Sequence, residues 1–132
     1  MATRAMIGEL TSEGYVRAVY SHWDGYPEGV GQTLLDHYTT SAQVNKLIGG
    51  GDLSSLGDSP TETEYYRDRG DTNVEPEIYY LEDYADHQEF NYVWTGRMWL
   101  VGVRNARGNW YKLSYYLRAS IEDIHEFVAE AV

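Results

Sequence analysis

The sequence YSHWDGYPEGVG, residues 20–31, marks the point at which an early pair of strands gives way to a helix. It gathers an imidazole, an indole, two phenols, two carboxylates, one proline and three glycines. Proline fixes its own φ and lacks an N–H, so Pro27 suits the first turn of a helix, where the charge of Glu28 is also favourable. We therefore treat the rest of the chain as a scaffold that holds this junction at the end of a sheet.

Two strands joined by a turn are predicted before the junction. Residues 4–9 and residues 15–20 carry the aliphatic, β-branched and aromatic side chains that favour strands. Residues 11–14, Thr-Ser-Glu-Gly, have the composition of a tight turn, so the two strands should form a hairpin. Side chains alternate along a strand. The second strand should therefore place Val16, Ala18 and Tyr20 on one face and Tyr15, Arg17 and Val19 on the other.

Two helices are predicted after the junction. Apolar residues at helical spacing indicate a helix over residues 27–38 and a second over residues 41–48, preceded by a Thr-Ser pair that can cap it. Gly29 and Gly31 lie inside the first helix, although glycine costs up to about 1 kcal/mol relative to alanine there. Close approach of the backbone, either to the sheet or to a ligand, would offset that cost.

The middle of the chain is polar and acidic. Residues 52–77 show little periodicity and are predicted as an acidic loop inserted into a single domain that spans residues 1–132. Residues 52–89 contain 12 acidic side chains against two arginines, so most of the net charge arises here. A strand over residues 77–81 and a turn or short helical segment over residues 82–87 follow.

The C-terminal third predicts three strands, over residues 90–95, 98–104 and 109–117, joined by short turns into an antiparallel meander. Ser120 should cap a final helix. This order of elements predicts an α+β fold rather than alternating βαβ units. We expect a single antiparallel sheet of about five to six strands with two to three helices packed on one face. The other face should be partly open and rich in Tyr and Trp.

Composition narrows the classes of function. The chain has 132 residues, a formal net charge of −11, 13 Tyr, 4 Trp and no Cys. This acidity disfavours direct binding to nucleic acids and to anionic membranes. It increases solubility, and it also favours binding to a basic protein partner or to a site on a protein that normally holds DNA. The lack of Cys excludes thiolate zinc sites and a Cys nucleophile, and it fits a cytoplasmic location. No apolar run has the length of a membrane span.

Thr3-Arg4-Ala5, together with HWDGYPEG at residues 22–29, resembles a family of small phage and bacterial proteins. Members begin Gly-Thr-Arg and carry His-x-Asp-x-Tyr-Pro after the second strand; the match covers roughly the first 40 residues, and Ala2 stands where the family has Gly. The resemblance implies a phage origin, the host-cell cytoplasm as location, and a shared site rather than a known reaction. Small phage proteins often block host defence by imitating DNA, capping an enzyme or sequestering a nucleotide signal.

The candidate ligand-binding site follows from the junction. His22 and Asp24 lie two residues apart at a strand end, so both can face the same way, and Arg4 comes from the neighbouring strand. In a catalytic interpretation, Asp24 could orient His22 as a general base while Arg4 holds an anion. In a purely structural interpretation, Arg4 and Asp24 could form an ion pair while the His22 ring hydrogen-bonds to a backbone carbonyl group. The predicted site comprises Arg4, His22, Trp23, Asp24, Tyr26 and Glu28.

Several functions remain open on these residues. The leading one is a phage-type, non-enzymatic binding protein that antagonises a host defence or regulatory system, either by capping a host protein or by sequestering a small nucleotide at helix N-terminal amides. One alternative is a small nucleotide hydrolase or lyase with His22 as base, and another is an acidic DNA-mimic inhibitor. No cofactor or metal is predicted, because the histidine and carboxylate spacing matches no zinc or EF-hand pattern. Exposed Tyr and Trp would suit a homo-oligomer interface.

Overall fold

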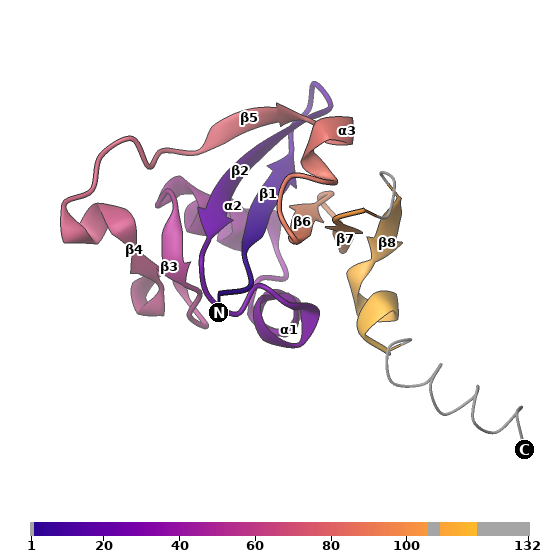
Figure 1. The fold of residues 1–132 in the computed structure, drawn as a ribbon, viewed down its shortest axis with the longest axis horizontal. Helices are drawn as coiled ribbons and strands as arrows, with labels where there is room; N and C mark the ends of the chain where they lie inside the picture. The colour runs from indigo at the N-terminus through magenta and orange to yellow at the C-terminus, as the bar shows by residue number, and fades with distance from the viewer. Residues whose placement is uncertain (1, 106–108, 119–132) are drawn as a thin grey trace, which may run out of the picture.

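The computed structural model describes residues 2–105 and 109–118, and Figure 1 shows its α+β architecture. The sheet is mixed and has eight strands. They are β1 (Ala5–Leu10), β2 (Tyr15–Ser21), β3 (Leu53–Ser55), β4 (Glu64–Tyr65), β5 (Glu77–Tyr80), β6 (Phe90–Trp94), β7 (Trp99–Val103) and β8 (Trp110–Lys112).

Helical segments are short. They are a π-helical turn (Pro27–Gly31), α1 (Gln32–His37), α2 (Ser41–Gly49), α3 (Leu81–Tyr84), two 3₁₀ turns (Pro60–Glu62 and Tyr66–Arg69) and the helical residues 113–118. The predicted α+β class is confirmed.

The order of strands is β4-β3-β2-β1-β6-β7-β8, and β5 shares the outer edge of β2 with β3. The predicted N-terminal hairpin is confirmed, with Ala5 opposite Ser21 and Leu10 opposite Val16. Its faces also follow the predicted alternation, because Val16 and Ala18 belong to one buried cluster and Val19 to the other.

The prediction of an antiparallel sheet of about five to six strands was wrong in two respects. The sheet has more strands, and β1 pairs in parallel with β6, from Ala5 opposite Phe90 to Glu9 opposite Trp94. Residues 5–8 are all buried, so β1 needs a neighbour on each edge. The hairpin fills one edge, and only a distant part of the chain can fill the other. That part is β6, which follows β5 and α3 in the chain and runs in the same direction as β1.

The larger core lies on the face covered by α1 and α2. Leu34, Leu47 and Ile48 from the helices have no exposed surface, and neither do Ile7 and Tyr92 from the sheet. α2 begins with a capping box, as the predicted cap required: the Thr40 hydroxyl accepts from the Gln43 amide at 3.2 Å, and the Gln43 side chain accepts from the Thr40 amide. Burial of these apolar side chains fixes both helices on the sheet.

The opposite face carries a smaller cluster of Met6, Val16, Ala18, Tyr84 and Val93. Tyr84 is fully buried there, and its hydroxyl donates to the Tyr92 carbonyl oxygen at 2.6 Å. Because Tyr84 belongs to α3, the helices are not all on one face as expected. Figure 1 shows α3 at the end of β5, away from α1 and α2.

Two further predictions change. Residues 52–77, predicted as a loop, contain β3, β4 and both 3₁₀ turns. The strand predicted over residues 109–117 ends at Lys112, and residues 113–118 are helical because Leu113 and Leu117, four residues apart, are both buried against the larger core. The helix predicted from Ser120 lies outside the described residues.

Candidate functional site

The junction leaves the sheet beside β3. The amide of His22 donates to the Leu53 carbonyl oxygen at 3.2 Å, and the amide of Trp23 donates to that of Ser54 at 3.0 Å. Asp24 then adopts a left-handed backbone conformation with φ of 59°. This conformation ends the extended run and turns the chain towards the π-helical turn.

Close packing explains the glycines of the junction. A Cβ atom on Gly25 would lie 2.6 Å from the Thr3 carbonyl oxygen, and one on Gly31 would lie 3.2 Å from Leu113 Cδ1 and 3.3 Å from Tyr92 Cε1. The Tyr92 hydroxyl donates to the Gly25 carbonyl oxygen at 2.6 Å, so β6 anchors the junction directly. These contacts support the explanation that the glycines seat the helix against the sheet.

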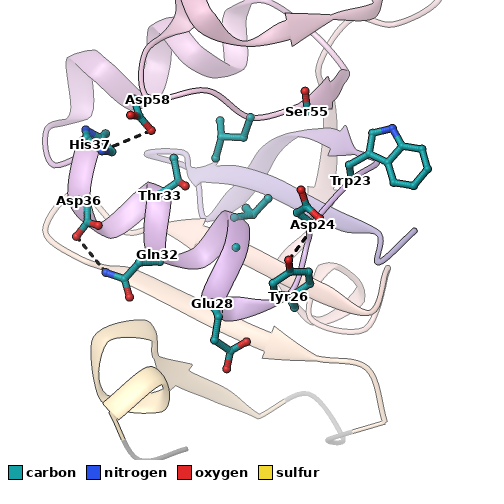
Figure 2. Close-up of a pocket in the computed structure, with 13 residues that line it drawn as sticks. Trp23, Asp24, Tyr26, Glu28, Gln32, Thr33, Asp36, His37, Ser55 and Asp58 are labelled. Carbon is teal, nitrogen blue, oxygen red and sulfur yellow. Dashed lines mark hydrogen bonds and ion pairs between the residues drawn. The ribbon is translucent and has the colours of Figure 1, made fainter. Parts of the chain in front are cut away.

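A recess of about 320 Å³ opens between the junction, α1 and the segment after β3. Figure 2 shows Asp24 and Tyr26 at one end and His37 with Asp58 at the other. Trp23 and Tyr26 are 46% and 40% exposed, so two aromatic rings lie at the surface beside it. The polar lining residues are Asp24, Tyr26, Glu28, Gln32, Thr33, Asp36, His37, Ser55 and Asp58.

The recess is strongly acidic. Four carboxylates line it, and none of its described lining residues is Lys or Arg. His37 Nε2 lies 3.5 Å from Asp58 Oδ1, and Gln32 Nε2 donates to Asp36 Oδ1 at 3.0 Å. One imidazole cannot neutralise four carboxylates, so the recess attracts cations and repels anions.

The predicted site residues divide into two groups. Trp23, Asp24, Tyr26 and Glu28 line the recess, whereas Arg4 and His22 do not. Within residues 2–105 and 109–118 no ion pair joins Arg4 to Asp24.

His22 has a different environment from the recess. Its Nδ1 lies 2.7 Å from the Tyr20 hydroxyl oxygen, and its ring forms a T-shaped pair with Trp23, with centroids 4.7 Å apart. Burial raises the pKa of Tyr20, and the nearby Arg4 charge partly offsets this rise. Trp23 is therefore the residue that connects the two groups, since it contacts His22 and also lines the recess.

The recess also contains residues that the sequence did not single out. Asp36 comes one turn after Gln32 on α1, and this i, i+4 spacing was a detectable sign that both face the same way. Ser55 is the last residue of β3 and Asp58 lies in the segment after it, and no local pattern connects either residue to the junction.

Among the described residues, no group of three His, Asp or Glu side chains is placed to hold a metal ion. Nor does any helix in residues 2–105 and 109–118 combine the length and apolarity needed to cross a bilayer. Comparison of this chain with protein-family models, with curated proteins and with solved structures returned no match.

Proposed function

We propose that this chain is a non-enzymatic binding protein whose acidic recess takes a basic side chain from a protein partner. The observation that carries the proposal is the combination of four carboxylates with the exposed rings of Trp23 and Tyr26 around one recess. Carboxylates form charge-assisted hydrogen bonds with Arg and Lys, and aromatic faces attract the same cations. A volume of about 320 Å³ lies at the small end of the range for ligand pockets and has room for a long basic side chain.

Acidic surface beyond the recess supports a protein partner. Of the 12 acids in residues 52–89, all but Asp52 and Glu89 are exposed, so a wide negative field surrounds the recess. Such a field accelerates association with a basic surface. It also suits the DNA-mimic version of the proposal, in which these carboxylates occupy a site that normally holds phosphates.

The resemblance to phage proteins extends the proposal to the partner's identity: a component of a host defence or regulatory system, met in the host cytoplasm. Capping a protein is favoured over sequestering a nucleotide, because phosphate groups in the recess would face Asp24, Glu28, Asp36 and Asp58.

The hydrolase or lyase alternative depends on His22. Its contact with the Tyr20 hydroxyl fixes the orientation of the ring, as a general base requires. Turnover of a nucleotide panel that is lost in His22→Ala, with unchanged circular dichroism, would favour this alternative over the binding proposal.

The proposal is tested with triarginine amide as a probe, titrated into ¹⁵N-labelled protein. We expect the indole resonance of Trp23 and the amides of Tyr26 and Asp36 to shift, and the affinity to fall with added salt. Asp24→Asn and Asp36→Asn should each weaken binding by about two- to five-fold. Asp68→Asn, which removes an exposed carboxylate remote from the recess, is the matched control. An equal loss of affinity in all three variants would show non-specific charge attraction and would contradict the assignment of the recess as the binding site.

A cyclic dinucleotide panel forms the second arm of this experiment. Binding that is abolished by Arg4→Ala and unaffected by Asp36→Asn would replace the basic-partner proposal with nucleotide sequestration.

A further inference from the structure

The strand β5 presents a second surface, separate from the recess. It pairs only with β2 among the described strands, opposite residues 15–18, whereas the recess begins at Trp23 beyond the other end of β2. In Figure 1, β5 runs along the outside of β2. One edge of β5 therefore has no neighbouring strand in the described part of the chain.

Backbone hydrogen bonds identify which groups face that free edge. The Tyr15 carbonyl oxygen accepts from the Thr11 amide at 2.7 Å, and the Tyr15 amide donates to the Thr11 hydroxyl, so the Tyr15 backbone points away from β5. Because the direction alternates along an antiparallel strand, Val16 and Ala18 are the β2 residues that bond to β5.

The register then assigns the β5 residues. Val16 is opposite Tyr79 and Ala18 is opposite Glu77, so these two β5 residues bond to β2. Ile78 lies between them, and its N–H and C=O consequently point outwards from the sheet. An outward donor and acceptor on an extended strand form a ready template for pairing with another chain.

The side chains beside this edge are unusually apolar for a surface. Ile78 is 60% exposed and Tyr80 is 61% exposed. Tyr80 packs edge-on against Tyr15, with ring centroids 5.5 Å apart, so three large apolar side chains form one patch at the edge. Exposed apolar patches next to an unpaired strand edge are typical of interaction sites.

Charge selects the occupant of the edge. Glu75, Glu77, Glu82 and Asp83 are all exposed on and around β5. The basic residue opposite Ile78 on β2, Arg17, is paired with Glu9 at 3.8 Å. Pairing of β5 with a second copy of itself would bring these carboxylates against their equivalents. A segment with basic side chains would instead find complementary charge.

We infer that β5 accepts an extended, basic segment of a partner protein, which adds a strand to the sheet. The backbone of that segment bonds to the N–H and C=O of Ile78, its apolar side chains pack on Ile78, Tyr80 and Tyr15, and its Lys or Arg side chains lie beside the flanking acids. This is a strand-addition mode, in which main-chain bonds provide affinity and alternate side chains provide specificity. Strand addition at β5 is a second binding mode, distinct from the proposed binding of a basic side chain in the recess.

The test uses a hexapeptide amide of alternating lysine and valine as the probe, with the full ¹⁵N-labelled chain. In the free protein, the Ile78 amide should exchange with solvent faster than those of Glu77 and Tyr79. The probe should shift the Ile78 and Tyr80 amides and slow exchange at Ile78. Two control peptides carry glutamate in place of lysine, or N-methyl groups on alternate residues, and each should bind at least about ten-fold more weakly.

Two substitutions provide a matched pair. Ile78→Pro removes the outward N–H and leaves the bonds of Glu77 and Tyr79 to β2 in place, as edge strands tolerate. Ile78→Thr keeps the N–H and a β-branched side chain. We expect Ile78→Pro to weaken the probe about ten-fold and Ile78→Thr to weaken it only a few-fold. If Ile78→Pro unfolds by circular dichroism, the N-methylated peptide supplies the same comparison on the native chain.

Three outcomes would overturn the inference: unchanged binding of the N-methylated peptide, equal binding of the glutamate peptide, or a dimer of the free chain that Ile78→Pro dissociates, which would assign the edge to a second copy. Asp36→Asn should leave the probe's affinity for β5 unchanged. Failure of the recess proposal and failure of strand addition are therefore separate results.

Discussion

The two faces of the sheet use alternate residues of the same strands, yet they differ in size and completeness. Ala5, Ile7 and Val19 face α1 and α2, in a cluster that also contains residues of those helices, of β3, β4, β6 and β7, and of the helical residues 113–118. Met6, Val16 and Ala18 face the other way, in a cluster that is completed by Tyr84 and Val93 alone. Partly buried residues such as Phe90 and Tyr116 border the first cluster, but its buried members far outnumber them. In the second cluster, partly buried residues such as Tyr20 and Tyr79 are as numerous as the buried ones.

This difference separates the part of the protein that provides most of its stability from the parts that are accessible to partners. The larger core supplies most of the buried apolar area, so it dominates stability. The smaller face leaves Tyr20 and His22 only part-buried. The exposed Ile78 and Tyr80 lie on the face of Val19, beyond the larger core, opposite Arg17 and Tyr15. The recess likewise lies at the margin of the larger core rather than within it. Candidate functional surfaces therefore occur where each core ends.

The strongest test of this contrast is a pair of leucine deletions. Leu47 on α2 is fully buried in the larger core, whereas Leu81 on α3 is only partly buried against the smaller one. Leu47→Ala should lower the free energy of unfolding by about 2–5 kcal/mol, and Leu81→Ala should cost clearly less. Urea titration followed by circular dichroism measures both. Equal losses would contradict the unequal weight given to the two faces.

A second pair removes one buried hydroxyl from each face. Tyr92 donates to the Gly25 carbonyl oxygen, and Tyr84 donates to the Tyr92 carbonyl oxygen, both at 2.6 Å. Tyr92→Phe and Tyr84→Phe should each cost about 1–3 kcal/mol, because each leaves a buried acceptor without its partner. Only Tyr92→Phe should also shift the Trp23 indole resonance, since only Tyr92 anchors the junction. A shift of the same size in both variants would refute that anchoring role.

A third test acts on the larger face through its helix cap. Thr40→Ala removes the hydroxyl that accepts from the Gln43 amide and should cost about 1 kcal/mol in thermal or urea unfolding. Thr40→Ser keeps the cap and should lose less. If Thr40→Ala proves neutral, packing alone fixes the start of α2.

The smallest effect is expected at Asp52, which lies where β5 and β3 meet the edge of β2 and accepts from the Tyr20 amide at 2.9 Å. Burial raises the pKa of Asp52 above its ordinary value of 3.8, and the hydrogen bond from Tyr20 opposes this. The folded state thus holds this proton more tightly than the unfolded state does. The stability that the neutral form contributes is complete below pH 3.8 and is lost as the pH rises through the raised pKa.

Asp52→Asn keeps an acceptor for the Tyr20 amide and cannot ionise. It should therefore be slightly more stable than the native chain at pH 7, with the difference disappearing towards pH values below the ordinary pKa of 3.8. Urea midpoints across this range measure the change. Glu13→Gln, in the exposed hairpin turn, controls for the loss of one negative charge, and an equal gain there would remove any special role for Asp52.

Local signals predicted the elements that local forces build. The hairpin over residues 5–21, α2 with its cap and the β6–β7 pair follow from alternation, turn composition and capping chemistry. The prediction for the segment after Lys112 was wrong because its tyrosine-rich composition favours a strand. The four-residue spacing of Leu113 and Leu117 already matched one turn of a helix.

Long-range pairing gave no such signal. The parallel register of β1 with β6 joins segments that are adjacent only in the folded sheet, and β3 and β4 are too short to show periodicity. The same limit applies to the recess. Its junction residues stood out by composition, whereas Asp58 joins them only through the path of the chain after β3.

The parallel pairing of β1 with β6 also has a consequence for how the chain reaches its native state. β1 is synthesised well before its second neighbour, which begins at Phe90, so the central ladder stays incomplete until the chain has been made beyond that residue. Closing so long a loop carries an entropic cost before any contact repays it. Refolding should therefore take roughly milliseconds to seconds, slower than for helical domains of this length.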